Sequence, residues 1–283
     1  MHQMETIDPF LKWPGGKRWL VQKYGLQMPS GCKRYMEPFL GSGAVYFYLK
    51  PTKAVLSDSN QELINAYKCI RDFPDIIDRR LKYLHKRHGE KLYYKMRNKT
   101  PKTDVGKAIR FIYLNRTCFN GIYRVNLKGE FNVPMGSKSI VQYPAGYLDS
   151  LSRLLKYATL KVNDFENTID MAGDGDFLFV DPPYTVKHNN NNFIKYNAHL
   201  FSWADQVRLS SAIRRAASRG AHIMLSNADH SSIRMLYCDF GNHNRVDRAS
   251  VLAADSQNRC RTTELLITTF KTKMGEQVAG EEH

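Results

Sequence analysis

The feature that most constrains the fold of this chain is residues 177–184, FLFVDPPY. The first four residues form a short apolar run with aromatic and β-branched members, which is typical of a strand buried on both faces of a sheet. The strand ends at the prolines, because proline cannot continue the ladder of backbone hydrogen bonds. Sheets covered on both faces belong to α/β proteins, which bind ligands beyond the carboxyl ends of their strands. The sequence therefore predicts an α/β fold with residues 181–184 in a ligand site.

Residues 181–184 offer two hydrogen-bond acceptors beside an aromatic ring. An ionised Asp181 can only accept hydrogen bonds. Pro183 keeps Pro182 out of the helical region, which turns the Pro182 carbonyl outward as a second acceptor. This pair suits a planar amine on a heterocyclic base, which donates its two hydrogens to the acceptors while its ring stacks on Tyr184. A proline-rich turn without function is the alternative, and the position at a strand end favours the functional interpretation.

A second candidate site follows an earlier strand, where residues 34–37 lead into a glycine turn and a helix over residues 44–49. Strand, Gly-x-Gly and helix is the opening of a nucleotide-type βα unit. The third glycine of the dinucleotide fingerprint and the Gly-Lys-Ser/Thr of phosphate loops are absent, so NAD and ATP are weak matches. The pattern suits a ligand with an adenosine and no phosphate, whose cationic part lies near Glu37.

Two shorter signals accompany this unit. The next strand, residues 53–56, is followed by Asp58, and an acid at this point commonly binds the hydroxyls of a ribose. A cap on the following helix explains Asp58 equally well. Upstream, residues 12–17 combine a Pro-Gly-Gly turn with Trp13 and two lysines, before a helix over residues 18–24. This turn can offer a ligand a closely approaching backbone, an aromatic face for stacking and two cations. An ordinary loop is the alternative.

The chain has 42 Lys and Arg residues against 27 acids, a net charge of +15. This excess favours a polyanionic partner. Much of it lies in residues 59–115, which we expect to form helices, including the basic run 79–88. Such a run is usually a solvated helix face, and contact with phosphates is the second interpretation. His85 and His88 have metal-like spacing, but without cysteines or a carboxylate set nearby we expect no metal site.

Residues 115–135 are expected to form a β-hairpin, with alternating residue types, Gly129 at the turn and a proline near the exit. Several side chains are of kinds that recognise DNA: arginine pairs with guanine and asparagine with adenine in the major groove, and an aromatic ring can wedge between bases. These side chains are Phe119, Asn120, Arg124 and Asn126. A purely structural hairpin is the alternative.

The remainder of the chain continues the α/β pattern. The predicted elements are strands over residues 159–162, 221–225 and 263–270, and a helix over residues 203–219 that is capped by Ser202. The first of these strands ends at Asp164 and Phe165. We also expect a polar, asparagine-rich loop over residues 189–192 and a polar tail that is disordered over residues 272–283.

Five cysteines are far apart, odd in number and contain no C-x-x-C pair. This pattern is typical of a reduced, cytosolic protein and favours neither a disulfide framework nor a zinc site. No apolar run approaches about 18 residues, and the amino end carries acids without an apolar core. We therefore expect no membrane span and no signal peptide.

Taken together, these motifs resemble the Dam-type, D12 class family of DNA adenine methyltransferases over roughly residues 10–270. Four features carry the resemblance, in one order: residues 12–17, residues 37–43, the hairpin 115–134, and residues 181–184. The resemblance implies a Rossmann-like, mostly parallel sheet of seven strands, with an inserted helical target-recognition domain that carries the β-hairpin. It also implies S-adenosyl-L-methionine as cofactor, double-stranded DNA as partner, and a cytoplasmic location in a bacterial cell or a phage-infected host.

The resemblance also assigns domains and site residues. The expected domains are residues 1–56 and 148–271 for catalysis and residues 57–147 for target recognition. The expected catalytic residues are Asp181, Pro182, Pro183 and Tyr184. The expected cofactor-binding residues are Trp13, Lys17, Glu37, Pro38, Phe39, Gly41, Ser42, Gly43, Asp58, Asp164, Phe165 and Asp181. The expected DNA-binding residues are Lys12, Arg116, Phe119, Asn120, Ile122, Arg124, Asn126 and Pro134.

Among these, Phe119 matches an intercalating position and Arg124 a guanine-reading position. Family members with this hairpin tend to methylate GATC, so we expect transfer of a methyl group to the amino group of a flipped adenine in GATC. An RNA adenine or DNA cytosine substrate is the nearest alternative, and the hairpin favours duplex DNA because A-form RNA hides its major groove. A non-catalytic DNA-binding regulator is the other alternative, but it leaves residues 37–43 and 181–184 without a purpose. The sequence departs from the family in the asparagine-rich loop and over residues 247–261.

Overall fold

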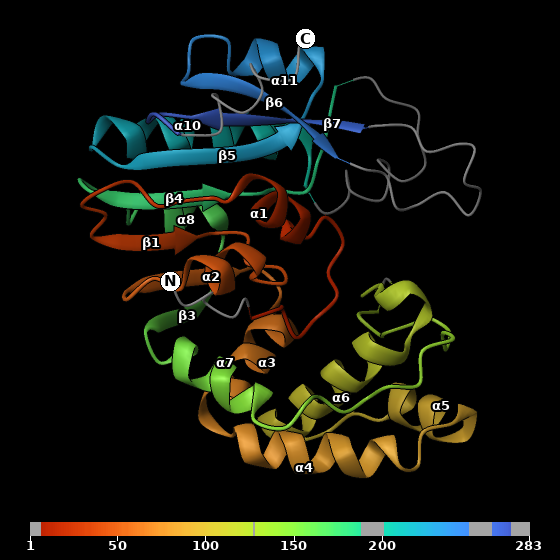
Figure 1. Ribbon diagram of the computed structural model, residues 1–283. Helices are drawn as coiled ribbons and strands as arrows, with labels where there is room; N and C mark the ends of the chain where they lie inside the picture. Colours follow the sequence, from red (N-terminus) through yellow and green to blue (C-terminus); the bar gives the residue numbers. More distant parts are fainter. Residues whose placement is uncertain (1–6, 127, 188–200, 249–261, 273–283) are drawn as a thin grey trace, which may run out of the picture. The chain divides into compact units, whose positions relative to one another are not determined.

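The computed structural model describes residues 7–126, 128–187, 201–248 and 262–272, and its strands form a mixed seven-stranded sheet (Figure 1). The strands are β1 (Arg34–Glu37), β2 (Ala54–Asp58), β3 (Ala158–Val162), β4 (Asp176–Val180), β5 (His222–Ala228), β6 (Asn242–Arg248) and β7 (Thr262–Thr268). Their order is β3-β2-β1-β4-β5-β7-β6. Strand β1 runs parallel to β2 and β4, and β4 runs parallel to β5, whereas β7 is antiparallel to β5 and β6. The predicted α/β class and the seven-stranded sheet are confirmed.

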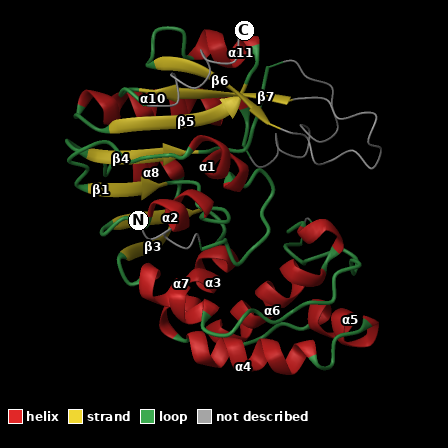
Figure 2. Cartoon of the chain, in the orientation of Figure 1, coloured by secondary structure: helices red, strands yellow, loops and turns green. Residues whose placement is uncertain are grey.

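Helices lie between successive strands from β1 to β6, and several follow one another between β2 and β3 (Figure 2). They are α1 (Arg18–Tyr24), α2 (Ala44–Leu49), α3 (Gln61–Asp72), α4 (Pro74–His85), α5 (Glu90–Asn98), α6 (Asp104–Thr117), α7 (Tyr147–Leu155), α8 (Phe165–Ile169), α10 (Trp203–Ser218) and α11 (Ser231–Leu236). The described residues fall into two compact units. The first unit comprises residues 7–16, 40–52 and 58–162, and the second comprises residues 17–39, 53–57 and the described part from 163 onward. The domain boundaries implied by the resemblance, 57 and 147, stay a prediction.

In the second unit, one face of the sheet is covered by α8, α10 and α11. Alternate strand residues such as Leu178, Val180 and Leu225 point to this side and join one buried apolar cluster with the helices. Helix α10 begins where Ser202 and Asp205 form a reciprocal capping box, which confirms the predicted cap. Figure 1 shows α10 behind the sheet and α1 in front of it.

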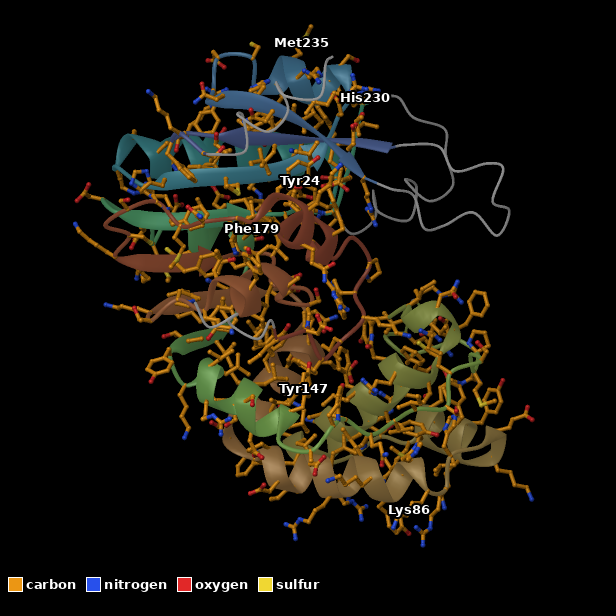
Figure 3. All side chains as sticks on the ribbon, viewed as in Figure 1. Tyr24, Lys86, Tyr147, Phe179, His230 and Met235 are labelled. Carbon is orange, nitrogen blue, oxygen red and sulfur yellow. The ribbon has the colours of Figure 1, made fainter. Side chains whose placement is uncertain are left out.

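Burial in this unit follows the strands closely. All five residues of β4 are buried, including Phe179, which is 1% exposed and is labelled in Figure 3. Met235, on the outer helix α11, is by contrast 77% exposed. Helix α1 is tied to β6, because the Asp247 N–H donates to the Tyr24 hydroxyl at 3.2 Å and Lys23 donates to the Asp247 carbonyl. Because every residue of β4 is buried, the strand fixes the position of residues 181–184, which follow it directly.

The first unit contains the helices predicted over residues 59–115. Helix α6 supplies much of its core, with Phe111, Ile112 and Tyr113 each 2% exposed or less. Helix α3 packs on α6 and α7, and α4 and α5 also pack on α6. Two helix starts have side-chain caps, Asn60 for α3 and Thr103 for α6, and these fix where the chain enters each helix.

The structure differs from prediction at residues 115–135. Instead of two continuous strands, the described residues there form two isolated bridges, Cys118 with Met135 and Val125 with Phe131. The chain does reverse at Gly129, which has a φ of +77°. A short 3₁₀ turn over Phe119–Gly121 interrupts the pairing that an alternating sequence favours. Strand β6 was not predicted, because the run 242–248 is polar apart from Val246.

Some predictions lie outside the described residues. These are the loop 189–192, most of the divergent stretch 247–261 and nearly all of the tail 272–283. Among the helices that the structure describes, none is long and apolar enough to cross a membrane.

Candidate functional site

The carboxyl end of β4 presents Asp181 to a buried lysine. Lys17, which precedes α1 and is 3% exposed, lies with its Nζ 2.8 Å from Asp181 Oδ1. Burial raises the pKa of Asp181 to about 6, against the opposing effect of the Lys17 charge, and the nearby Glu264 adds to the rise. Asp181 is therefore an acceptor that loses its charge in the mildly acidic range.

Tyr184 is held by its hydroxyl. The hydroxyl donates to Glu264 Oε2 at 2.7 Å and lies 2.8 Å from Ser226 Oγ. Lys17 Nζ also lies 4.9 Å from the centroid of the ring. Burial raises the pKa of the Tyr184 phenol well above its usual value, so the hydroxyl remains a donor. Three members of this polar network, Lys17, Ser226 and Glu264, are far from Tyr184 in the sequence.

Sequence reasoning missed Glu264 and Ser226. Glu264 lies in β7 and Ser226 in β5, and the two strands pair antiparallel with Ala228 opposite Glu264. A usable signal was present, because Glu264 opens the apolar run 265–267 and an acid in a buried strand needs partners. Lys17 was expected on the cofactor side. The structure pairs it with Asp181 and Glu264, and its cofactor role stays a prediction.

The carboxyl end of β1 places a second buried carboxylate. Glu37 is 3% exposed and accepts a hydrogen bond from the Tyr35 hydroxyl at 2.8 Å. Pro38 is buried after it, and Phe39 stacks on Phe165 with ring centroids 5.3 Å apart. A buried carboxylate that lines the end of a parallel strand suits a cationic group on a ligand.

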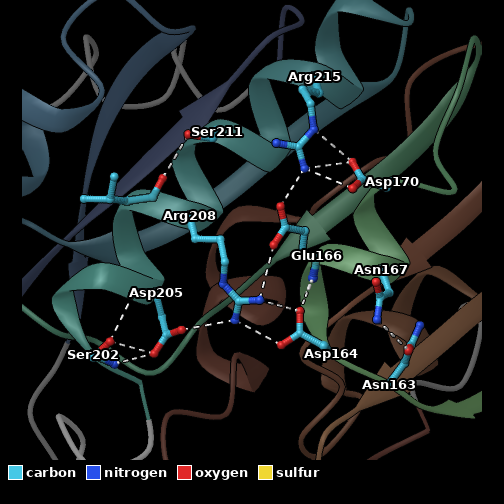
Figure 4. A network of polar contacts seen from close by, with 11 residues as sticks. Asn163, Asp164, Glu166, Asn167, Asp170, Ser202, Asp205, Arg208, Ser211 and Arg215 are labelled. Atoms are coloured by element: carbon cyan, nitrogen blue, oxygen red, sulfur yellow. Dashed lines mark hydrogen bonds and ion pairs between the residues drawn. The ribbon is translucent and has the colours of Figure 1, made fainter.

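Asp164 lies at the start of α8 in a network of ion pairs (Figure 4). Its carboxylate accepts the Glu166 N–H at 2.9 Å and two N–H groups of Arg208 at 3.0 Å each. Phe165 is 6% exposed, and the Arg208 guanidinium lies 4.3 Å from its ring centroid. The structure therefore gives Asp164 structural partners, and the adenine-binding role of Asp164 and Phe165 stays a prediction.

In the first unit, the glycine turn after β1 has the geometry that the sequence implied. Gly41 has a φ of +47° and Gly43 a φ of +65°, conformations that favour glycine, and Gly43 is the N-cap of α2. A Cβ on Gly41 would lie 2.8 Å from the Trp13 ring, so the turn and Trp13 approach closely. Ser42 is 7% exposed between the two glycines.

Asp58 braces this turn. One carboxylate oxygen accepts the Gly41 N–H at 3.1 Å and the other accepts the Asn60 N–H at 3.0 Å. The cap of α3 is Asn60, whose side chain accepts the Leu63 N–H, so Asp58 is not the cap. Burial raises the pKa of Asp58. Its role on a ribose stays a prediction.

A cluster of cations lies near the start of the chain in the first unit. Burial, together with the nearby charges of Lys138 and Arg116, lowers the pKa of Lys12 to about 8. The Lys12 backbone is fixed by Asn115, which accepts its N–H at 3.0 Å and donates to its carbonyl at 2.8 Å. Arg116 donates to the carbonyls of residues 140 and 142. Mutually repelling cations favour an anionic partner.

Some of the residues predicted to bind DNA in the loop 115–135 are exposed, and others make hydrogen bonds within the loop. Phe119 is 53% exposed, and Arg124 is also exposed while its Nε donates to Asn132 Oδ1 at 2.9 Å. Asn120 has a positive φ of +54°, which is uncommon outside glycine. Asn126 is used within the loop, because its Oδ1 accepts the N–H groups of residues 128 and 130.

The last two residues predicted to bind DNA in this loop, Ile122 and Pro134, contribute to the structure of the loop. Ile122 is partly buried, and the exposed Pro134 accepts the Phe119 N–H at 2.9 Å through its carbonyl.

Within the described residues no group of three or more His, Cys, Asp and Glu side chains could hold a metal ion. His88 Nδ1 instead lies 2.9 Å from the Tyr113 hydroxyl, and burial lowers the pKa of His88.

The chain is similar to known proteins along most of its length. A family model described as D12 class N6 adenine-specific DNA methyltransferase matches residues 13–251. The type II methyltransferase M1.LlaDCHI of Lactococcus lactis subsp. cremoris is 36% identical over 275 residues, which cover 94% of this chain and 96% of the relative. A DNA adenine methylase of Vibrio cholerae serotype O1 is 30% identical, covering 83% of this chain and 86% of the relative. The DNA N-6-adenine-methyltransferase of Escherichia phage P1 is 35% identical, covering 81% of this chain and 31% of the relative.

Proposed function

The chain belongs to the D12 class of N6 adenine-specific DNA methyltransferases, and from this premise we propose that it transfers a methyl group from S-adenosylmethionine to an adenine flipped out of duplex DNA, within GATC. The observation that carries the proposal is the end of β4, where a largely buried carboxylate, two prolines and an aromatic ring follow one another. GATC is proposed because residues 115–135 resemble the hairpin of family members that methylate this site. The family is specific for adenine in DNA, which leaves the RNA, cytosine and regulator alternatives without support.

The chain's own part in the reaction is to hold the amine. Asp181 and the Pro182 carbonyl accept the two hydrogens of the adenine amino group. The lone pair of that nitrogen is delocalised into the ring, and the two hydrogen bonds favour a pyramidal nitrogen whose lone pair is available. Because both acceptors are in place beforehand, they stabilise the positive charge that develops on nitrogen without reorganisation. Tyr184 provides the face on which the base stacks.

The residues around the glycine turn fit S-adenosylmethionine. When bound, this cofactor supplies a methyl group on a positively charged sulfur. Glu37 is a buried carboxylate that suits this charge, and a Cβ on Gly43 would lie 2.9 Å from the Tyr67 hydroxyl, so only a bare backbone fits there. The residues proposed to hold the cofactor are Trp13, Lys17, Glu37, Pro38, Phe39, Gly41, Ser42, Gly43, Asp58, Asp164, Phe165 and Asp181.

Residues 115–135 carry exposed side chains that suit duplex DNA. The target base must leave the stack, which costs a few kcal/mol. Phe119 is a large exposed aromatic side chain that can fill the space that the flipped base leaves in the duplex. Stacking of the flipped base on Tyr184 offsets the rest of the cost of flipping. Arg124 is the residue proposed to recognise a guanine, because its exposed guanidinium can bond both acceptors of that base. Lys12 and Arg116 are proposed to face the phosphates.

The proposal is tested by methyl transfer to short duplexes. The wild-type protein, labelled S-adenosylmethionine and duplexes that contain GATC, or GATC with one base pair changed, are compared by initial rates. We expect each changed base pair to lower the rate by about ten- to a hundredfold, the equivalent of about 1–3 kcal/mol. Equal rates on all duplexes would exclude GATC, and transfer to a matched RNA but to none of the duplexes would exclude a DNA substrate.

Two variants separate recognition from loop structure. Arg124→Ala removes the guanidinium, and Asn132→Ala removes the same internal hydrogen bond while it leaves the guanidinium in place. We expect Arg124→Ala to lose discrimination at one guanine, by about 1–3 kcal/mol, and Asn132→Ala to keep it. If the two variants lose discrimination equally, Arg124 supports the loop and does not recognise a base.

A further inference from the structure

Glu264 is a buried acid that the proposed reaction does not use. It is 3% exposed and lies in β7 next to Leu265, which is fully buried. A buried carboxylate costs several kcal/mol unless it is paired and hydrogen-bonded. Its position on an apolar strand beside the end of β4 therefore calls for an explanation.

The partners of Glu264 all lie around the proposed active site. Oε2 accepts the hydroxyl of Tyr184 at 2.7 Å and lies 3.5 Å from Lys17 Nζ. Ser226 Oγ lies 3.4 Å from the same oxygen. The other oxygen, Oε1, pairs with Arg248 at 3.1 Å. One carboxylate thus joins the stacking ring, the lysine beside Asp181 and the end of β6.

Lys17 is shared between two carboxylates. Its ammonium is 2.8 Å from Asp181 and 3.5 Å from Glu264, so Asp181 is the closer partner. Among the residues that the structure describes, the charged and titratable groups that face Asp181 are Lys17, Glu264, Arg248 and Tyr184. Without Glu264, Lys17 would pair with Asp181 alone and would compete more strongly with an incoming amine for that carboxylate.

We propose that Glu264 is a positioning residue of the methyl-transfer site, which tethers the Tyr184 ring through its hydroxyl and draws Lys17 partly away from Asp181. The inference rests on the proposed function for its consequence in catalysis. It has two separable parts, because the hydroxyl tether depends on a hydrogen bond and the effect on Lys17 depends on charge.

The charge part is tested with Glu264→Gln. The amide has nearly the same shape and its oxygen still accepts the Tyr184 hydroxyl, but the negative charge is gone. Glu264 raises the pKa of Asp181, so its neutralisation lowers that pKa. We expect the acid limb of the rate of methyl transfer to move to lower pH by about half a unit or more. Asp239→Asn, which removes a carboxylate paired with Arg214 outside the network, is the matched control and should leave the limb in place.

The tether part is tested with Tyr184→Phe. This variant keeps the ring and the charge of Glu264 and removes only the hydroxyl. We expect the acid limb to stay where it is in the wild type, while a 2-aminopurine probe at the target position shows at least about a threefold loss of the flipped-out fluorescence signal. An unchanged signal overturns the tether.

A readout without activity keeps this inference distinct from the proposed function. The ionisation of Asp181 is followed by carbon-13 NMR of the aspartate carboxyl groups in the free protein, wild type and Glu264→Gln. A lower midpoint in the variant supports the inference even if no DNA is methylated. An equal midpoint overturns it even if methyl transfer is established. Thermal unfolding of each variant identifies loss of fold, and if Glu264→Gln does not fold, the Tyr184→Phe comparison still decides the tether part.

Discussion

At the scale of single residues, the ionisation of Asp181 limits what the site can do. In the proposed reaction the charged carboxylate of Asp181 accepts the amine, and burial raises its pKa to about 6. Below that pH the neutral acid predominates and the ion pair with Lys17 is lost. We therefore expect the single-turnover rate of the wild-type protein to be flat above pH 7 and to fall about tenfold per unit below pH 6.

The same argument predicts the effect of Asp181→Asn. The amide keeps the shape of the side chain but turns a donor toward the amine and leaves Lys17 without its closer partner. We expect methyl transfer to fall by about a hundred- to a thousandfold, while S-adenosylmethionine binding, measured by calorimetry, survives. Turnover like that of the wild type would remove Asp181 from the reaction.

At the scale of elements, the strand–turn–helix unit after β1 depends on Gly43. Its φ is +65°, and an added Cβ would lie 2.9 Å from the Tyr67 hydroxyl, which donates to the Gly41 carbonyl at 3.0 Å. Gly43→Ala combines backbone strain with the loss of that hydrogen bond. We expect it to lower the free energy of unfolding by about 2–4 kcal/mol, measured by urea denaturation.

Gly15→Ala is the matched control for this turn. Gly15 has a similar φ of +78°, but an added Cβ would meet no atom within 4 Å. The variant should therefore lose only the strain, about 1 kcal/mol. Equal losses for the two variants would show that the contact with Tyr67 contributes nothing to stability.

At the scale of the whole molecule, the net charge of +15 predicts binding to DNA that weakens steeply with salt. Lys138 lies beside Lys12, whose pKa burial lowers to about 8. We expect Lys138→Ala to weaken binding equally on all sequences and to reduce the slope of log K against log salt by about 0.9, measured by fluorescence anisotropy. Lys33→Ala, whose lysine pairs with Asp174, should keep the wild-type slope. An unchanged slope in Lys138→Ala would remove this cluster from the DNA interface.

Several elements of both units were predictable because their signals are local. The strand β4, the helix α10 with its Ser202 cap, and the glycine turn depend on hydrophobic pattern, capping and backbone conformation, which act over a few residues. Strand β6 was missed, since its run is polar and it pairs only with β7 in the described structure. In residues 115–135 the predicted antiparallel pairing and the turn at Gly129 are present, but the pairing is limited to isolated bridges, because Asn120 and the 3₁₀ turn break a regular alternation.

By itself, the sequence determined the α/β class, the family resemblance and the residues at the ends of β1 and β4. Only the tertiary structure decided that Lys17 pairs with Asp181 and that Glu264 holds the Tyr184 hydroxyl. The physical reason is the distance along the sequence over which each interaction acts. Motifs report what neighbouring residues can do, whereas the contact of Tyr184 with Glu264 depends on the register of β7 against β5, across 80 positions of the chain.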